Sequence, residues 1–362
     1  MIRGCSGLFA AFFFLWFDVF HLYGAAAPAG LLAELRKLSP AERESHLVEG
    51  AKREGKMIWY SNINLDQAGK MKGEFERRYP FVKVDLWRGS GNQVVDRVLN
   101  EARAGKNDVD VINAGGVGTY ILVREGMIGR YVSPESAGYA NIFRDKEGYW
   151  TSMAYSPSIM AYNTNLVKAE EAPKRYEDFL QLKWKGEIAI DMESDRIVSA
   201  WLASWGEKKT VDYMNGLVAN NIIIRKGHTL LTQLLCSGEF KVAPELYAYQ
   251  VARMKHERGC PIGFNFPNPA PSSMTPLAMA KRTSHAHAAA LFIDFLLSAG
   301  GQKIVSDVGR LPSRRGVAAK YGELTDLESK GIKFLMLGPE EEGKYLSRSF
   351  NLVEEIFVRR RR

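Results

Sequence analysis

The side chains with the most potential for chemistry follow apolar runs of this chain that predict buried strands. Tyr60, Ser61 and Asn62 follow one run, the segment Gly89-Ser90-Gly91-Asn92 follows a second, and Asn113 ends a third. Open α/β sheets bind ligands at this edge, where the carboxyl ends of parallel strands meet. The glycines allow close approach of the backbone, and the amides at the start of the next helix suit a carboxylate or phosphate. A plain capped turn uses the same small residues, so both interpretations stay open.

A second polar group lies in the later half of the chain. Asp195 and Arg196 open a predicted helix after the strand 188–190, so we expect them to face a cleft between two lobes. Glu245, Tyr247 and Tyr249 follow the strand 242–243. Two tyrosines beside a carboxylate can hold a hard cation, or cradle a polar ligand by stacking and hydrogen bonding. Aromatic packing between lobes is an equal alternative.

Recognisable catalytic motifs are missing from the sequence. It has no Gly-x-Ser-x-Gly elbow and no phosphate-loop lysine, and the glycine run 114–118 lacks the spacing of a dinucleotide-binding loop. His285 and His287 are two residues apart, so they would lie on different faces of a helix, and we expect them at the surface where it opens. His228 and His256 stand alone among polar residues, which indicates neither a zinc site nor a catalytic cluster. We therefore expect a protein that is not an enzyme.

Hydrophobic periodicity predicts the elements that position these residues. Apolar runs at 57–60, 82–86 and 110–113 alternate with amphipathic segments at 66–79 and 94–102. Three strand–helix steps in so short a span indicate a parallel sheet. The later half continues in the same way, whereas residues 261–276 hold five prolines and predict a loop. The fold class is therefore α/β, in two lobes that are each a mixed, mostly parallel sheet flanked by helices.

The two ends of the chain predict segments outside this fold. Arg3, an apolar run at 8–17 and an alanine-rich stretch predict a secretory signal peptide over 1–29, with cleavage before Gly30. An uncleaved anchor or a mis-assigned start is the alternative. The last four residues are arginines that carry half of the formal net charge of +8, and we expect 351–362 to be a basic tail. Because no other basic stretch is interleaved with aromatics, the charge argues against nucleic-acid binding.

Three cysteines are too few for a disulfide framework. Cys5 lies in the predicted signal peptide, which leaves Cys236 and Cys260 in the mature chain. An exported protein could pair them. We favour two separate, half-buried thiols, because nothing in the sequence brings them together.

Six segments in this order resemble the periplasmic substrate-binding proteins of ABC importers, in the ferric-iron and thiamine-binding branch of the type 2 fold. They are 57–62, 89–91, 108–112, 162–167, 184–188 and 309–313, and the resemblance spans about residues 45–320. It implies a Venus-flytrap protein with lobe 1 formed by 30–157 and 266–350 and lobe 2 by 158–265. Such a protein closes on its solute by hinge motion and delivers it to a permease and ATPase complex at the inner membrane. The resemblance thus implies a periplasmic protein, which we expect to be a monomer.

The ligand is where the chain departs from iron-binding members of that branch. No histidine follows the first strand, and Leu246 stands where one of two adjacent tyrosines is expected. We therefore expect a small polar or anionic solute and no resident cofactor. The alternatives are transported ferric iron held by Glu245, Tyr247 and Tyr249, a ligand-sensing ectodomain, or an enzyme on the same scaffold. The expected cleft residues are Tyr60, Ser61, Asn62, Ser90, Asn113, Asp195, Arg196, Glu245, Tyr247 and Tyr249.

Overall fold

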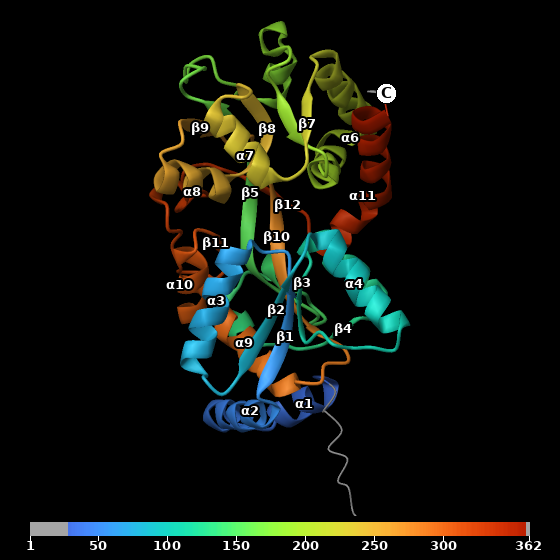
Figure 1. Ribbon diagram of the computed structural model, residues 1–362, viewed down its shortest axis with the longest axis vertical. Coiled ribbons are helices and arrows are strands. Elements are labelled where there is room, and N and C mark those ends of the chain that lie inside the picture. The colour runs from blue at the N-terminus through green and yellow to red at the C-terminus, as the bar shows by residue number, and fades with distance from the viewer. Residues whose placement is uncertain (1–27, 360–362) are drawn as a thin grey trace, which may run out of the picture.

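The computed structural model describes residues 28–359 as two lobes stacked along the long axis of the molecule (Figure 1). The predicted α/β class and the two-lobed arrangement are confirmed. Residues 1–27, which hold nearly all of the predicted signal peptide, and residues 360–362 lie outside the described part of the chain. The boundaries of the lobes in the sequence stay a prediction.

The sheet of lobe 1 has the strand order β2-β1-β3-β10. Strand β1 (Lys56–Ser61) pairs in parallel with β2 (Lys83–Arg88) and with β3 (Val111–Asn113), as the repeated strand–helix pattern predicts. The short β4 (Ile128–Gly129) pairs with the end of β10. The helices of this lobe are α1 (Pro28–Leu35), α2 (Pro40–Glu54), α3 (Leu65–Arg78), α4 (Gly91–Arg103), α5 (Gly115–Arg124), α9 (Ala286–Leu297) and α10 (Ala299–Asp307).

The core of lobe 1 is built around aromatic side chains from three elements. Trp59 of β1, Phe75 of α3 and Phe292 of α9 are fully buried. The Phe292 ring centroid lies 5.0 Å from that of Trp59 and 5.0 Å from that of Phe75. Burying large rings in this way is worth roughly 2–3 kcal/mol each. This packing holds the strands rigidly, so their carboxyl ends present a fixed edge toward lobe 2.

Two long strands, β5 (Thr151–Asn163) and β10 (Ala270–Ala280), connect the lobes. They pair with each other in antiparallel fashion from Thr151 to Pro157. The later half of β5 then pairs with β8 (Val242–Tyr247) and β9 (Ile262–Asn265) in lobe 2. The flanking strands β11 (Leu311–Pro312) and β12 (Phe334–Met336) pair with β5 and β10. The lobes therefore share one continuous sheet.

The prediction of a loop over 261–276 is wrong, because β9 and most of β10 lie there. Every residue of β10 is buried, which favours a strand despite its prolines. The pairing of β10 with β5 shifts register between Thr275 and Pro276, and proline, which has no N–H to donate, is tolerated at such an irregularity. Composition alone predicted a loop, whereas burial between two neighbouring strands determines the structure.

Lobe 2 adds a parallel pair, β6 (Ala189–Asp191) and β7 (Ile223–Arg225), beside β8. Its main helices are α6 (Asp195–Ala219), α7 (His228–Ser237) and α8 (Ala248–Arg258). Each of these helices begins within a few residues of the end of a strand. Their N-termini therefore gather at the same edge as the strand ends of this lobe, and this edge faces lobe 1 (Figure 1).

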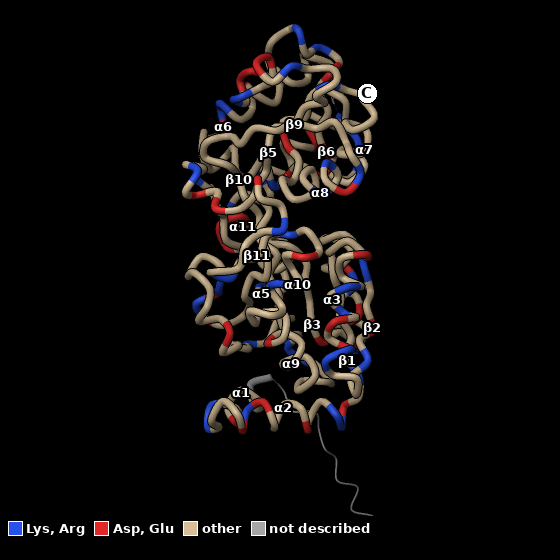
Figure 2. Tube along the Cα trace, turned by 90° about the vertical axis from the view of Figure 1, so that its left-hand side faces the viewer, with Lys and Arg blue, Asp and Glu red and all other residues tan. Residues whose placement is uncertain are grey.

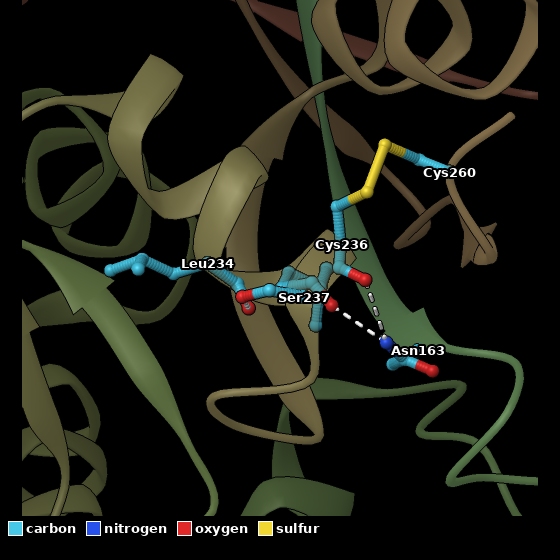
Figure 3. Close-up of a disulfide and its surroundings, with 6 residues drawn as sticks. Asn163, Leu234, Cys236, Ser237 and Cys260 are labelled. Atoms are coloured by element: carbon cyan, nitrogen blue, oxygen red, sulfur yellow. Dashed lines mark hydrogen bonds between the residues drawn. A yellow bond between two sulfur atoms is a disulfide. The ribbon is translucent and has the colours of Figure 1, made fainter. Parts of the chain in front are cut away.

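A disulfide joins Cys236, near the end of α7, to Cys260, just after α8, with a Cα–Cα distance of 5.2 Å. The preference for two separate thiols is therefore wrong. The side-chain amide of Asn163, at the end of β5, donates to the carbonyl oxygens of Leu235 (2.8 Å) and Cys236 (3.4 Å), which fixes this end of α7 beside the sheet (Figure 3). The folding of α7 and α8 onto the same side of lobe 2 brings the two cysteines together.

The helix α11 (Pro339–Leu352) packs against α6 of lobe 2 and against α5 of lobe 1. A π-helical turn, Val353–Val358, follows it and buries Val353, Ile356 and Phe357 in the core of lobe 2. The prediction of a basic tail over 351–362 is therefore wrong for 351–358. Apolar residues at three positions of this segment attach the end of the chain to lobe 2.

Charged residues of both signs occur throughout the described part of the chain. Figure 2 shows basic and acidic positions interspersed along both lobes. Within residues 28–359, no single helix is long and apolar enough to span a membrane. The bent pair α9 and α10 meets that test only jointly, and the apolar residues of α9 are packed in the core of lobe 1.

Candidate functional site

Lobe 2 gathers an ionic cluster at the ends of its strands. Asp191 ends β6, Glu245 lies in β8, and His228 is the first residue of α7. Nδ1 of His228 lies 2.8 Å from Oδ2 of Asp191, and Nε2 lies 2.6 Å from Oε2 of Glu245. Burial lowers the pKa of His228, but the charge of Glu245 and the hydrogen bonds to both carboxylates outweigh it and hold that pKa well above its usual range. His228 is therefore a cation held between two anions at neutral pH.

Arg196, in the first turn of α6, extends this cluster. Its Nη2 lies 3.2 Å from Oε1 of Glu245, so each oxygen of that buried carboxylate contacts a different cation. Its guanidinium lies 4.6 Å from the centre of the Tyr247 ring, which is within the range of a cation–π interaction. The side chain of Arg196 keeps 26% of its surface exposed, whereas Glu245 keeps 1%. Arg196 is thus fixed by the cluster and still accessible from the space between the lobes.

Two tyrosines form the aromatic part of this face. The Tyr247 ring stacks between His228 and Tyr249, with centroid distances of 4.3 Å and 5.7 Å. The guanidinium of Arg310 lies 4.7 Å from the centre of the Tyr249 ring and donates a hydrogen bond of 2.9 Å to Oγ1 of Thr275 in β10. Arg310 directly precedes β11, and Thr275 lies in β10, one of the two strands that connect the lobes. The stack of tyrosine rings is therefore attached to the connecting strands.

The facing edge of lobe 1 consists of helix N-termini. Ser90 caps α4: its Oγ accepts from the Gln93 amide at 3.3 Å, and the Gln93 side chain accepts from the Ser90 amide at 2.8 Å. A Cβ at Gly91 would lie 2.7 Å from the carbonyl oxygen of Ala114, so glycine is needed where the starts of α4 and α5 touch. The edge therefore offers backbone amides and helix dipoles that favour a negative charge.

Two cavities lie at opposite ends of the strands. A small one of about 10 Å³ lies between the lobes, lined by residues that include Ser158, Arg196, Ser272 and Glu342. A larger one of about 330 Å³ lies in lobe 1 and is lined by residues that include Val98, Val109, Met127 and Ala280. Val109 precedes β3, so the larger cavity is at the amino ends of the parallel strands. The larger cavity is therefore away from the edge where such sheets bind ligands, whereas the small one lies between the lobes, next to Arg196 and Glu342.

Comparison with known proteins agrees with this geometry. Residues 122–338 match the sequence model of the bacterial extracellular solute-binding proteins, which covers more than half of the chain. The chain belongs to that family. No curated protein matches the chain significantly. The resemblance inferred from six segments is therefore confirmed at the level of the family.

Solved structures share the fold of this solute-binding protein at low sequence identity. Iron-bound HitA from Pseudomonas aeruginosa is 20% identical, with a TM-score of 0.75 over 83% of this chain and 99% of that chain. AfuA from Actinobacillus pleuropneumoniae, with fructose-6-phosphate bound, is 20% identical with a TM-score of 0.72 over 83% and 98%. The Trichodesmium protein IdiA (FutA), in complex with iron and citrate, is 20% identical with a TM-score of 0.67 over 83% and 99%. These likenesses establish the two-lobed fold.

The structure brings together the five predicted residues of lobe 2, Asp195, Arg196, Glu245, Tyr247 and Tyr249, within and beside the ionic cluster. Burial raises the pKa of Asp195, which precedes Arg196. In lobe 1, Asn62 and Ser90 lie at the edge that faces this cluster: the Asn62 amide is between Gly91 and Gly115. These seven positions lie toward the space between the lobes, with Glu245, only 1% exposed, buried behind Arg196.

Tyr60, Ser61 and Asn113 are placed elsewhere, because all three are almost fully buried in lobe 1. The Tyr60 hydroxyl donates to Glu101 of α4 at 2.8 Å. The Asn113 side chain accepts from the Trp59 indole at 2.7 Å and donates to the Pro276 carbonyl. Tyr60 thus ties the sheet to α4, Asn113 ties β3 to β1 and β10, and none of the three residues lines the interlobe face.

The interpretation of the histidines needs correction. His228 does not stand alone: it is the centre of the ionic cluster. It comes three residues after the end of β7, so the strand-end rule that selected Asp195 also applied to it. His285 and His287 do open α9, but they are not surface residues, since they contact Asp110 at 2.9 Å and Glu54 at 2.8 Å and are mostly buried. Within residues 28–359, no group of three or more His, Cys, Asp or Glu residues has a geometry suited to a metal ion.

Arg310 and Glu342 also lie at this face, although the sequence did not predict them. Arg310 lies within a segment that supported the family resemblance, but nothing in the sequence assigns it to the tyrosine stack. Glu342 lies in the first turns of α11, and the sequence gives no sign that this helix reaches the strand ends of the two lobes.

Proposed function

We propose that this extracytoplasmic solute-binding protein captures a small anionic solute between its lobes. The observation that carries the proposal is the accessible Arg196 of lobe 2, fixed by Glu245 at 3.2 Å, opposite helix N-termini of lobe 1. A guanidinium on one side and backbone amides on the other suit a carboxylate or a phosphate. Closure would exclude water and strengthen both interactions, since the effective dielectric constant falls.

The charges around the tyrosine pair support an anion over ferric iron. Arg196 lies over Tyr247, and Arg310 lies over Tyr249. Burial raises the pKa of Tyr247 more than the charges of Arg196 and His228 lower it, so the phenol stays protonated at neutral pH. A hard trivalent cation requires anionic oxygen ligands, and here it would lie close to fixed positive charges.

The arrangement of His228 supports binding without catalysis. A general base needs a ring nitrogen that is free to take a proton from the substrate. Both nitrogens of His228 face carboxylates instead, and the raised pKa keeps both of them protonated. The histidine therefore fixes the position of Glu245, which in turn fixes Arg196.

We propose that the protein acts as a monomer in the periplasm and hands its solute to a permease and ATPase complex. The disulfide between Cys236 and Cys260 supports an oxidising compartment, because cytosolic thiols are kept reduced.

Native mass spectrometry of the gently purified chain tests this function, since tightly held solutes co-purify. We expect a bound organic anion in the wild type and its loss in Arg196→Ala. Small-angle scattering should show the solute-free protein becoming more compact when the released solute is added back. A ferric adduct with a phenolate charge-transfer band in place of an organic anion would contradict the proposal.

A further inference from the structure

A carboxylate of the protein itself occupies the space between the two lobes. Glu342 of α11 keeps only 2% of its surface exposed, and its Oε2 has no hydrogen-bond partner among the described residues. Glu342 reaches the first turn of α5 so closely that a Cβ at Gly116 would overlap its carboxyl group. The backbone of Val117, in the same turn, lowers the pKa of that group. Glu342 therefore stands where an anionic ligand would meet the N-terminus of α5.

The surroundings of Glu342 come from both lobes. From α6 of lobe 2, Arg196 and Asp195 act on its charge with opposite signs, and Glu245 of β8 and His228 of α7 lie behind Arg196. From the connecting strands, Ser158 and Ser272 line the same small cavity, and Oγ of Ser272 is buried without a hydrogen-bond partner within residues 28–359. From α5, Tyr120 packs against Gly343 of α11. A guanidinium, a free hydroxyl and helix amides around one carboxylate make a complete set of anion ligands.

The attachment of α11 decides how Glu342 can leave. The later part of the helix is fixed to lobe 2: Oγ of Ser349 lies 3.0 Å from Oγ of Ser199, and the turn after the helix is buried in that core. Its first turns touch α5 of lobe 1 through Glu342 and Gly343. Separation of the lobes would therefore carry Glu342 away from α5 while the rest of α11 stays with lobe 2.

We propose that Glu342 is an internal ligand of the anion subsite formed by the α5 N-terminus, Arg196 and Ser272, and that the solute's anionic group must displace it. The proposal rests on the proposed function and adds a residue that sets the affinity. With about 10 Å³ free between these groups, an oxyanion and Glu342 cannot both fit.

The same geometry sets a direction for the pH dependence. Burial raises the pKa of Glu342 to about 7, against the lowering effect of Arg196. Relative to the displaced position, the buried position is therefore favoured most at low pH, and it loses stability as the pH rises from the ordinary carboxyl pKa of 4.5 to about 7, above which the loss is complete. Displacement into water returns the group to an ordinary carboxyl pKa, so displacement becomes easier as the pH rises and releases a proton.

Sulfate is a suitable probe, because it does not titrate between pH 6 and 8. Calorimetric titration of the full chain should show sulfate affinity rising about tenfold from pH 6 to pH 8, with proton release. Over one pH unit in which displacement releases one proton, the binding constant changes about tenfold. Glu342→Gln keeps the neutral form at every pH, so we expect the low-pH affinity throughout. Glu342→Ala should bind more tightly than the wild type, and its affinity should not change with pH. Glu341→Gln, an exposed neighbour, should match the wild type.

The outcomes separate this inference from the proposed function. If the wild type binds sulfate but Glu342→Gln and Glu342→Ala both follow its pH profile, the internal ligand is disproved and the anion site stands. That persistent pH dependence would assign the titration to Asp195 or His228 instead of Glu342. If neither the wild type nor Glu342→Ala binds sulfate, and no organic anion co-purifies, both proposals fail.

Discussion

Nε2 of His228 lies 2.6 Å from Oε2 of Glu245, at the point in lobe 2 where a helix start meets the end of a strand. Glu245 holds Arg196 through its other oxygen. A histidine that contacts no solute can therefore determine where a guanidinium points. Fixing a binding side chain through buried partners reduces the entropy lost when a ligand binds.

His228→Asn should destabilise the protein mainly at low pH. The folded-state pKa of His228 is raised, so its stabilising contribution is complete below about 6.5, the unfolded value, and is lost as the pH rises through the folded value. The variant leaves Asp191 and Glu245 buried without their cation, and we expect a loss of roughly 3 kcal/mol at pH 6. Urea denaturation at pH 6 and pH 9 measures it. His256→Asn, at a site 46% exposed, is the control, and an equal loss at both pH values would contradict the assignment.

Arg196→Lys should weaken solute binding while keeping the charge. The ammonium cannot reproduce the planar fork that contacts Glu245 and still presents donors to the solute. We expect affinity for the co-purified solute to fall roughly tenfold to a hundredfold, the loss of one charge-assisted hydrogen bond. Arg77→Lys is the matched control, because Arg77 is exposed on α3 and pairs only locally with Glu74 at 2.7 Å. Unchanged affinity in Arg196→Lys would mean that Arg196 only supports lobe 2.

The Tyr60→Phe variant tests whether Tyr60 has a structural role in lobe 1 or contacts the solute. The Tyr60 hydroxyl donates to Glu101 at 2.8 Å, and Arg97 lies over its ring at 4.4 Å, so its partners belong to lobe 1. Removing the hydroxyl should cost about 1 kcal/mol of unfolding free energy and leave solute affinity unchanged. Thermal denaturation and calorimetric titration of the same preparation measure both. Reduced affinity with unchanged stability would return Tyr60 to the site.

The strand-end rule explains why much of the fold and the polar residues of lobe 2 could be predicted. The apolar runs around Trp59 and Val111 carry enough periodicity to place β1 and β3, and the rule then selects Arg196 and Glu245 from the residues that follow strands. The rule gives position along the chain but not the direction of a side chain. Tyr60 and Asn113 satisfy it and point into lobe 1.

The remaining features depend on contacts between distant segments. Pro271 and Pro276 predict a loop by composition, yet neighbouring strands bury them in β10. Glu342 meets α5 across more than two hundred residues of sequence, and only the assembled fold places it there. Cys236 and Cys260 are 24 residues apart and come together because α7 and α8 pack side by side.

Replacement of both cysteines by serine should lower stability without abolishing solute binding. The disulfide closes a loop of 24 residues, and the loss of that constraint on the unfolded chain costs roughly 3 kcal/mol in the chain-entropy model. The pair lies at the ends of α7 and α8, away from the starts where the ionic cluster forms. Thermal denaturation with and without a reductant should therefore show a lower midpoint for the reduced wild type, equal to that of the double variant. A midpoint that does not change on reduction would indicate free thiols in solution.

An ion pair across the lobes should bias the protein toward the closed form. Arg253 of α8 contacts Asp66 of α3 and also pairs with Glu257 at 3.2 Å. Asp66 is half exposed, so the pair contributes only about 0.5 kcal/mol, or roughly a twofold change in the ratio of closed to open molecules. Asp66→Lys replaces attraction by repulsion and should increase the radius of gyration of the solute-free protein in small-angle scattering. Adding Arg253→Glu should restore the wild-type value, and high salt should reduce both effects. If the double variant stays as open as Asp66→Lys, the single substitution acts through some contact other than this ion pair.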